Sequence, residues 1–456
     1  MTVLDAAVRP FWPHREYRDS GVDWLGALPE QWRVKRFGYL LERNDSGVWG
    51  DEGGPEDTLV LRSTDMTVDG RWHLSDPERR LLSVRDRSNT ELLEGDIVLT
   101  KSSGSQLHLG KSAIVDGWVA NLNACFSNFM QRLRCSSELE PKFTWYFLNA
   151  RPGREQLLYR GSTTTGLANL NGHIVGATLV PLPPLPEQRA ISAFLDRETA
   201  KIDNLIAKKE RLIALLQEQR AAVITHAVTR GLDPAALMRD SGVEWLGQVP
   251  KHWGMTRLKR VTDAIVDCPH STPVYSAAGE FPVIRTSDVS PGVLSLQSSL
   301  RVSEEEYRKR VERLTPRGGD ILYSREGERF GIAALVPAGV QACLGQRMMH
   351  FRSGRRSDPA FLMWQLNAHP TYDQARLDST GATSPHVNVD TIRNFRISLP
   401  PLAEQEAIAC EVQAVSRHLD ELQALVVTAS DRLREYRSAL ISAAVTGKID
   451  VRGEVE

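Results

Sequence analysis

The sequence predicts an α+β protein with two globular domains of mixed α/β structure and two long helices, arranged as an internal repeat. One observation is a clause that occurs twice, as SGVDWLGALPEQW at 20–32 and as SGVEWLGQVPKHW at 241–253. Another is that each copy ends in a long stretch with the apolar spacing of a coiled coil. The third is that short β-type runs, broken by Gly, Pro, Asp and Ser, fill the space between these features.

Self-comparison defines the repeat and its extent. Residues 18–37 match 239–258 at 11 of 20 positions, 182–191 match 399–408 at 8 of 10, and 220–233 match 437–450 at 7 of 14. Between these matched segments, in 38–181 and 259–398, the likeness fades to scattered islands. The chain is therefore interpreted as a tandem duplication in which a fixed frame holds a diverged insert.

The long stretches are predicted to be amphipathic helices of ~40 residues, roughly 60 Å long at 1.5 Å per residue. Residues 187–230, for example, contain no Gly or Pro. Such helices need a partner for the apolar face, and the other helix of the same chain is favoured over another protein. The expected packing positions are Ile191, Leu195, Ile202, Leu205, Leu212, Leu216 and Val223 in the first helix, and Ile408, Val412, Val415, Leu419, Leu422, Val426, Leu433 and Leu440 in the second.

Composition and charge limit the classes of protein. With 41% hydrophobic and 25% charged residues, the chain has the composition of a soluble globular protein. The five cysteines include no CxxC pair, which favours reduced, buried thiols in a cytoplasmic protein. No signal peptide and no membrane span are expected. The net charge of −1 argues against broad nucleic-acid binding, so any DNA contact must come from local patches or be shared with a partner.

No catalytic or metal-binding motif is evident, so no cofactor is expected to bind this chain. The stretch GSQLHLGKS at 104–112 has five residues between its glycines, whereas a phosphate-binding loop needs four. The two-tryptophan clause could form a base-stacking platform. Its spacing instead favours a tight turn in which both rings pack and anchor the entry to each globular domain.

Three motifs resemble those of the specificity subunit of type I restriction–modification systems. They are W-x-G-x-[LV]-P-x-x-W near the start, LPPLPEQ opening a long helix, and the terminal AVTGKIDVRG at 444–453. The resemblance covers nearly the whole chain. It implies that each insert is a target recognition domain, that each helix is a conserved spacer, and that the two helices pair antiparallel.

The resemblance also implies a non-catalytic subunit of a type I restriction endonuclease and adenine-specific DNA methyltransferase complex. The expected partners are double-stranded DNA, two methylation subunits that use S-adenosylmethionine, and two restriction subunits that use ATP and Mg. The predicted boundaries are an N-terminal segment at 1–17, recognition domain 1 at 18–181, spacer helix 1 at 182–232, recognition domain 2 at 233–398, spacer helix 2 at 399–450 and a tail at 451–456.

Two diverged readers on matched frames predict a bipartite, asymmetric DNA site. A rigid helical pair would give the gap between the half-sites one length, since readers on one face of B-DNA lie about 34 Å apart. Base edges are read by polar side chains on loops or helix ends, although such loops are often plain connections. The expected readers are Lys101, Ser103, Gln106, Arg160, Thr163, Thr164 and Asn169 in the first insert, and Arg325, Glu328, Arg329, Ser379, Thr380, Thr383 and His386 in the second.

The stretch RMMHFRSGRR at 347–356, which includes Arg352, is the candidate for phosphate contacts. Its alternative is a strand with a solvated basic edge. For the whole protein, the alternative is a non-catalytic coiled-coil scaffold whose globular domains bind proteins rather than DNA. An enzyme with an unrecognised active site is the remaining possibility.

Overall fold

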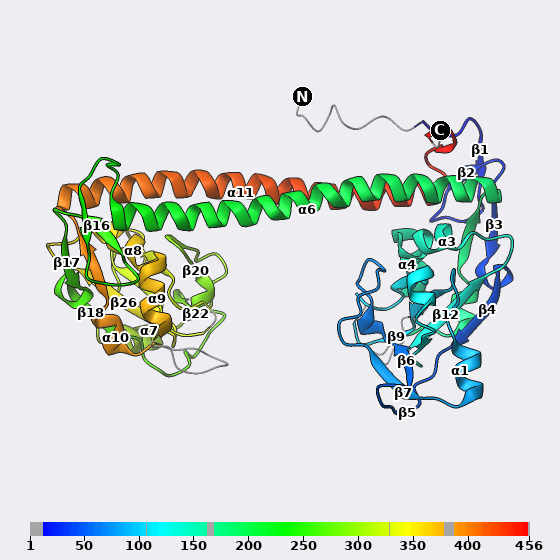
Figure 1. Cartoon of the computed structure of the whole chain (residues 1–456), viewed down its shortest axis with the longest axis horizontal. Coiled ribbons are helices and arrows are strands. Elements are labelled where there is room, and N and C mark those ends of the chain that lie inside the picture. The colour runs from blue at the N-terminus through cyan, green and yellow to red at the C-terminus, as the bar shows by residue number, and fades with distance from the viewer. Residues whose placement is uncertain (1–11, 106, 162–167, 328, 378–386, 455–456) are drawn as a thin grey trace. The chain divides into compact units, whose positions relative to one another are not determined.

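The computed structural model describes residues 12–105, 107–161, 168–327, 329–377 and 387–454 (Figure 1). The chain divides into two compact units. The first comprises Met1–Lys208 and Ala429–Glu456, and the second comprises Lys209–Thr428. Each unit therefore contains one globular domain and a segment of both long helices.

The two predicted long helices are confirmed as α6 (Leu185–Arg230) and α11 (Leu402–Val445). Proline-containing segments precede both helices, and an acidic residue, Glu187 or Glu404, lies in the first turn, where it complements the helix dipole. Each helix is followed within two residues by a glycine with positive φ, Gly231 or Gly447, which lets the chain turn away from the helix axis.

Within each unit the two helix segments run antiparallel. In the first unit Ile191 and Leu195 of α6 share a core cluster with Leu440 and Val445 of α11. In the second unit Ile224 and Val228 of α6 share one with Ile408 and Val412 of α11. The same ion pair occurs at matching places in the repeat, because Arg437 contacts Asp203 at 2.8 Å and Arg220 contacts Asp420 at 3.3 Å.

Two of the expected packing positions were wrong. Leu205 and Leu212 are 48% and 43% exposed, whereas their neighbours Ile206 and Ile213 are half-buried. Both members of each neighbouring pair are apolar, so the sequence pattern does not distinguish them, and at these two positions the isoleucine is the more buried residue. The remaining expected positions are buried (Ile191, Leu195, Ile202, Leu216, Ile408, Val412, Leu419 and Leu440) or half-buried (Val223, Val415, Leu422, Val426 and Leu433).

The first domain is built on a four-stranded antiparallel sheet in the order β10-β8-β12-β4. Its strands are β10 (Ser112–Ile114), β8 (Ile97–Thr100), β12 (Met130–Cys135) and β4 (Leu41–Ser46). A second sheet has the order β11-β6-β7-β5, with strands β11 (Cys125–Phe126), β6 (Thr58–Leu61), β7 (Glu78–Leu81) and β5 (Asp51–Glu52). The helices of this domain are α1 (Val84–Thr90), α2 (Gly117–Ala120), α3 (Pro141–Asn149), α4 (Arg151–Gly161) and α5 (Gly172–Gly176).

The second domain repeats the main sheet and has a smaller second sheet with one strand fewer. Its main sheet has the order β18-β26-β23-β24, with strands β18 (Thr262–Asp267), β26 (Met348–Ser353), β23 (Ile321–Ser324) and β24 (Ala333–Leu335). A smaller sheet contains β22 (Arg301–Val302), β19 (Phe281–Ile284) and β25 (Cys343–Leu344). The helices are α7 (Glu304–Val311), α8 (Pro359–Leu366), α9 (His369–Leu377) and α10 (Val389–Arg393).

Short antiparallel pairs attach each domain to its helix. In the first domain β1 (Tyr17–Asp19) pairs with β2 (Ala27–Pro29), and β3 (Arg33–Arg36) pairs with β14 (Leu179–Leu182), the strand directly before α6. In the second domain β15 (Met238–Asp240) pairs with β16 (Gln248–Pro250), and β17 (Gly254–Arg257) pairs with β27 (Arg396–Leu399), the strand directly before α11.

The repeated clauses of the sequence are the parts of one contact. The indole N–H of Trp32 donates to Glu187 at 3.0 Å, and that of Trp253 donates to Glu404 at 3.0 Å. Gly447 packs against Trp32, with room for no more than a hydrogen, since a Cβ there would lie 2.5 Å from a carbon of Pro29. Gly231 likewise lies close to Trp253 and Glu404. The tryptophan clause, the Pro-x-x-Glu-Gln clause and the glycine after a long helix therefore meet in each unit.

The expectation that both rings of the clause pack was half wrong. Trp32 and Trp253 are buried, but Trp24 and Trp245 are 40% and 39% exposed. Each exposed ring lies between two glycines with positive φ, Gly21 and Gly26 for Trp24, and Gly242 and Gly247 for Trp245.

All five cysteines are free thiols. Cys125, Cys268 and Cys343 are buried and Cys135 is half-buried, and burial raises the pKa of the Cys135 thiol to about 12. Cys410, in contrast with the expectation of buried thiols, is exposed on α11. Its position on the outer face of a long helix explains the difference.

Candidate functional site

The two predicted reading stretches of the first domain meet in the structure. Strand β9 (Ser102–Ser103) pairs antiparallel with β13 (Ala168–Asn169). The hydroxyl of Ser102 donates to Asn169 at 2.8 Å, and the backbone N–H of Leu170 donates to the carbonyl of Lys101 at 2.7 Å. Residues far apart in the sequence thus form one polar surface beyond the end of β8.

A chain of polar side chains underlies this surface. Lys101 donates to the Ser46 hydroxyl at 2.5 Å, and Gln131 donates to Asn44 at 2.7 Å. Asn44 in turn donates to the carbonyl of Gly172 at 2.8 Å. Partial burial lowers the pKa of the Lys101 ammonium. Sequence reasoning missed Asn44, Ser46 and Gln131. These strand residues hold the Lys101 ammonium and the segment after β13 close to the same sheet.

The second domain repeats the backbone contact with different side chains. The N–H of Val387 donates to the carbonyl of Arg325 at 3.3 Å, as Leu170 does to Lys101. Arg325 is only 7% exposed, and its guanidinium pairs with Asp267 at 3.1 Å and with Glu326. Asp267 also contacts His270 at 3.0 Å. An expected reader is therefore held by carboxylates of its own domain.

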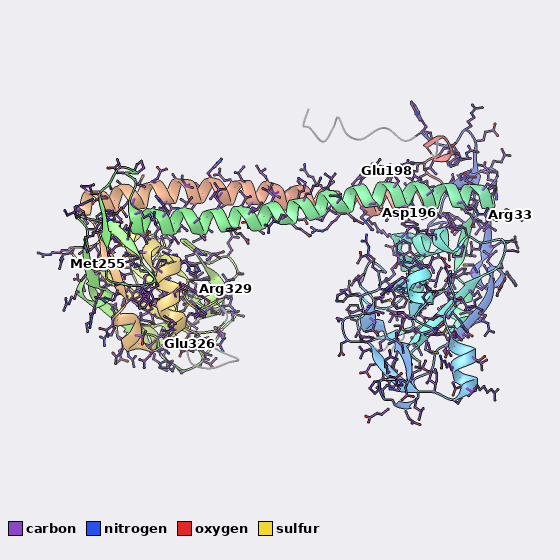
Figure 2. All side chains as sticks on the ribbon, in the orientation of Figure 1. Arg33, Asp196, Glu198, Met255, Glu326 and Arg329 are labelled. Carbon is purple, nitrogen blue, oxygen red and sulfur yellow. The ribbon has the colours of Figure 1, made fainter. Side chains whose placement is uncertain are left out.

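The other expected readers differ in exposure and in hydrogen bonding. Ser103 is half-buried and accepts the N–H of Ser105 at 3.1 Å. Arg160 is exposed at the end of α4. Arg329 lies on the second domain (Figure 2). Its side chain is exposed and donates to the carbonyl of Val289 at 2.7 Å. Eight expected readers lie outside the described residues: Gln106, Thr163, Thr164, Glu328, Ser379, Thr380, Thr383 and His386.

Arg352, the candidate for a phosphate contact, has a partner inside its domain. Its guanidinium binds Asp320 through two nitrogens, at 2.9 and 2.8 Å. Burial acts to raise the pKa of Asp320, but the hydrogen bonds from Arg352 and His350 outweigh it and lower the pKa. Arg134 binds Asp96 in the same way in the first domain, at 2.7 Å. The pairing with a carboxylate thus recurs in both domains, and a phosphate contact by Arg352 stays a prediction.

The rest of the basic stretch remains available. Arg347, Arg355 and Arg356 are exposed. Beside Arg347, the hydroxyl of Thr272 donates to Gln346 at 2.8 Å, and these residues line a cavity of about 230 Å³. The polar turn before β26 was the signal that could have added Gln346 to the candidates.

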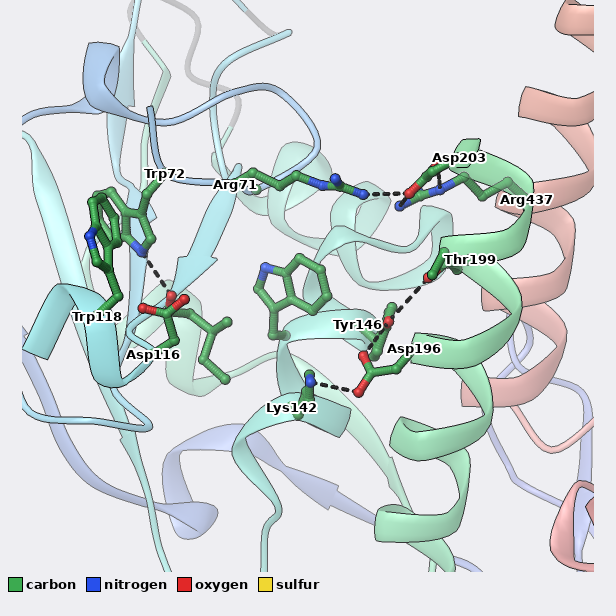
Figure 3. A pocket seen from close by; sticks show the side chains of 14 residues that line it. Arg71, Trp72, Asp116, Trp118, Lys142, Tyr146, Asp196, Thr199, Asp203 and Arg437 are labelled. Carbon is green, nitrogen blue, oxygen red and sulfur yellow. Dashed lines mark hydrogen bonds and ion pairs between the residues drawn. The ribbon is translucent and has the colours of Figure 1, made fainter. Parts of the chain in front are cut away.

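A larger cavity of about 580 Å³ lies where the first domain contacts α6 (Figure 3). Arg71 of the domain and Arg437 of α11 both contact Asp203 of α6. Lys142 pairs with Asp196 at 2.6 Å, and Asp196 also accepts the hydroxyl of Tyr146 at 2.8 Å. These mutual pairings attach the domain to the helix.

Within the described ranges, no group of three or more His, Cys, Asp or Glu residues could hold a metal ion. None of the helices in those ranges is long and apolar enough to cross a membrane.

Comparisons with known proteins agree with this architecture. The sequence model of the type I restriction modification DNA specificity domain matches residues 80–214 and 250–425, more than half of the chain. The chain is 23% identical to the type I restriction enzyme MjaVIII specificity subunit of Methanocaldococcus jannaschii over 93% of this chain and 94% of that protein. It is 24% identical to the EcoKI specificity subunit of Escherichia coli K12 over 94% of this chain and 92% of that protein.

Two solved structures share the fold. A chain solved in work on complex assembly and conformational transition of the type I R-M system has a TM-score of 0.69 at 18% identity, covering 92% of this chain and 99% of that one. The HsdS subunit from Thermoanaerobacter tengcongensis has a TM-score of 0.51 at 18% identity, covering 92% and 98%. With the two matched family segments, the duplicated domains and the two long helices, this chain belongs to the type I restriction–modification DNA specificity family and is a specificity subunit of such a system.

Proposed function

We propose that the two domains read the two unlike halves of one bipartite, asymmetric site in double-stranded DNA. The observation that carries this proposal is the contrast between the candidate surfaces. Their backbone contact is the same, from Leu170 to Lys101 and from Val387 to Arg325, but the side chains around it differ. Direct readout depends on the pattern of donors and acceptors offered to base edges, so unlike surfaces select unlike sequences.

The long helices are proposed to set the gap between the half-sites. Readers that bind one face of B-DNA are spaced by about 34 Å or multiples of it, so the spacer must hold them at a fixed separation. Support comes from the continuity of α6 and α11, which have 46 and 44 residues without a break. The helices are also proposed to dock two methylation subunits and two restriction subunits, with S-adenosylmethionine, ATP and Mg used by those partners in the cytoplasm.

The near-neutral net charge is consistent with a subunit that contacts DNA together with partner subunits. With 56 basic and 57 acidic residues, the chain has little surplus to neutralise phosphates. Several of its arginines, including Arg134 and Arg352, are paired with carboxylates inside their domains. Most of the affinity for the DNA backbone is therefore proposed to come from the partner subunits.

A domain exchange tests the proposal. Residues 38–181 are replaced by the corresponding insert of another family member, and the assembled methyltransferase is expressed in a host whose genome is then sequenced with detection of methylated bases. The expected result is a change in one half of the methylated site, with the other half and the gap unchanged. A simultaneous change of both halves would contradict separate reading.

A coiled-coil scaffold whose domains bind proteins is the second candidate, favoured by the net charge of −1. Gel retardation with the methylation subunits present separates the two. Preferential binding of a duplex that carries the methylated site over one that lacks it supports the reader, and the absence of any such preference supports the scaffold.

A further inference from the structure

The turn that leads into an inner strand of each main sheet has the same backbone contacts in both domains. Three residues connect β11 to β12 in the first domain, and three connect β25 to β26 in the second. The backbone N–H of the first turn residue, Ser127, donates to the carbonyl of Leu61 at 2.9 Å, and that of Gly345 donates to the carbonyl of Ile284 at 2.8 Å. The two turns are therefore equivalent positions of the repeat.

Both turns lie beside the stretches expected to read DNA. The N–H of Lys101 donates to the carbonyl of Phe129, the last residue of the first turn, at 3.0 Å. The N–H of Arg325 donates to the carbonyl of Arg347, the last residue of the second turn, also at 3.0 Å. A Cβ on Gly327, in the second expected stretch, would lie 3.4 Å from the guanidinium of Arg347. The last residue of each turn is thus at the same end of the main sheet as an expected reader.

The last residues of the two turns are unlike, and both side chains are accessible. Phe129 is 57% exposed, and Arg347 is exposed. Among the residues that the structure describes, the guanidinium of Arg347 has no carboxylate partner, whereas those of Arg325 and Arg352 are paired with aspartates. An exposed ring and an unpaired cation are therefore free to contact another molecule.

The middle residue of each turn carries a carboxamide. Asn128 is exposed and Gln346 is half-buried. The hydroxyl of Thr272 donates to the side-chain oxygen of Gln346 at 2.8 Å, and Gln346 and Arg347 line the same cavity of about 230 Å³. A carbonyl oxygen has two lone pairs, so Gln346 keeps both a donor and an acceptor. Both turns are thus equipped for the hydrogen bonds that base edges make.

The difference between Phe129 and Arg347 distinguishes the classes of occupant. A phosphate contact does not depend on sequence and would require a cation in both turns. A partner protein bound in two identical copies would favour the same side chain in both turns. Base edges differ between unlike half-sites, and the known pairings fit, because arginine binds guanine through O6 and N7 whereas phenylalanine contacts the methyl group of thymine.

We infer that the last residue of each turn determines sequence specificity. Arg347 binds a guanine in the half-site of the second domain, and Phe129 contacts the methyl group of a thymine in the half-site of the first. The inference rests on the proposed function and names side chains that carry out the reading.

The test uses the full chain assembled with methylation subunits, in a host whose genome is sequenced with detection of methylated bases. The domain exchange described above assigns each half-site to its domain. Arg347→Ala is expected to lower discrimination about tenfold at one G·C pair of the second domain's half-site, as expected for loss of a bidentate contact. Phe129→Ala is expected to lower discrimination about fourfold at one A·T pair of the other half-site, as expected for losing the burial of one methyl group.

Matched controls lie at the opposite ends of strands in the same sheets. Arg355 is exposed and follows the far end of β26, so Arg355→Ala removes the same charge away from the turn. Tyr39 is 78% exposed and precedes β4, whose other end, at Ser46, contacts Lys101. Neither Arg355→Ala nor Tyr39→Ala should alter the methylated sequence, and relaxation by a control equal to that of its partner variant would overturn the inference.

Competition binding separates base reading from a contact with the DNA backbone. The purified complexes are compared on duplexes that differ at one base pair and over a range of salt concentrations. An equal loss of affinity for all duplexes, with a weaker dependence on salt, would indicate a phosphate contact and overturn the inference for that residue. Unchanged discrimination in either variant, or relaxation in the half-site of the other domain, would do the same. If the unaltered complex methylated no bipartite site, the proposed function itself would fail and the inference with it, which differs from failure of the variants alone.

Discussion

The two domains share their backbone contacts and differ in the side chains between them. Ser46 faces Gln131 across the first sheet, and Asp267 faces Met349 at the same register of the second. Behind the first pair lies the polar Asn44, whereas its counterpart in the second domain is Ile265. The frame can therefore stay constant while the chemistry of each candidate surface changes independently.

The contacts that both domains share lie at the start of each long helix. Gln188 accepts the N–H of Glu140, the residue that caps α3, at 2.8 Å, and Gln405 accepts that of Asp358, which caps α8, at 2.9 Å. Each glutamine thus fixes a domain helix to a spacer helix. Contacts of this kind do not limit which bases the domain reads, which explains why they recur.

The largest expected effect comes from breaking the shared frame. Replacing Trp32 or Trp253 with alanine removes a fully buried ring and leaves a glutamate without its donor. Each is expected to lower the free energy of unfolding by about 3–5 kcal/mol, by an equal amount in both units. Urea denaturation followed by tryptophan fluorescence measures the loss. Trp118→Ala, at an exposed site, is the control, and a loss below about 1 kcal/mol for either buried ring would contradict a shared role.

The next effect concerns the buried carboxylate of the second sheet. Asp320→Asn leaves Arg352 and His350 without their anion and is expected to cost about 3 kcal/mol at pH 7. Because the folded pKa of Asp320 is lowered, its contribution to stability is present above the unfolded carboxyl pKa of about 3.9 and is lost as the pH falls through the lower folded value.

Thermal unfolding of the Asp320→Asn protein and the unaltered protein should therefore converge at acid pH. Glu312→Gln, at an exposed glutamate in the same domain, is the matched control. A constant difference between the two proteins from pH 7 down through the carboxyl range would show that the charge of Asp320 is not the cause.

A smaller effect should sharpen the contrast between the two candidate surfaces. Lys101→Met is expected to relax the sequence preference of one half-site by about 1–3 kcal/mol per affected base pair and to leave the other half-site unchanged. Arg325→Met should do the reverse. Detection of methylated bases across a host genome reports both halves at once, and an effect of either substitution on both halves would contradict independent surfaces.

The smallest effect belongs to the corrected helix positions. Leu205→Lys and Leu212→Lys replace exposed side chains and should change stability by no more than about 0.5 kcal/mol. Ile206→Lys and Ile213→Lys, at the half-buried neighbours, should each cost more. Equal losses at the two sets of positions would indicate that the helices use the phase that the sequence pattern first suggested.

Sequence reasoning predicted the features that repeat along the chain and missed those that depend on strand pairing. The duplicated clauses predicted the two domains and both long helices. They could not show that Arg352 meets Asp320, because that pair depends on the register between β23 and β26. Similarly, Asn44 and Gln131 are 87 positions apart in the chain, and only the sheet brings them together.

The exposure of Leu205 and Leu212 in the first helix was missed for a different reason. Leu205 and Ile206 are equally apolar, so no periodicity distinguishes the one that packs. The exposure of Trp24 was missed because spacing predicts a turn without predicting on which side of it the ring lies. Of the fifteen expected DNA contacts, eight lie outside the described residues. Six of the other seven have partners inside their own domain, since a polar loop carries no sign of what its side chains will bond.

The tail of α11 gives the protein an unusual order of assembly during synthesis. Tyr17 donates to the carbonyl of Gly447 at 3.0 Å, and Val451 is 1% exposed in the core of the first unit. The second unit, Lys209–Thr428, is one uninterrupted stretch of chain, but the first also needs residues from Ala429 onward. The first domain is thus synthesised before the second unit but obtains its complete set of contacts only after it, and the nascent chain must keep the first domain unaggregated in the meantime.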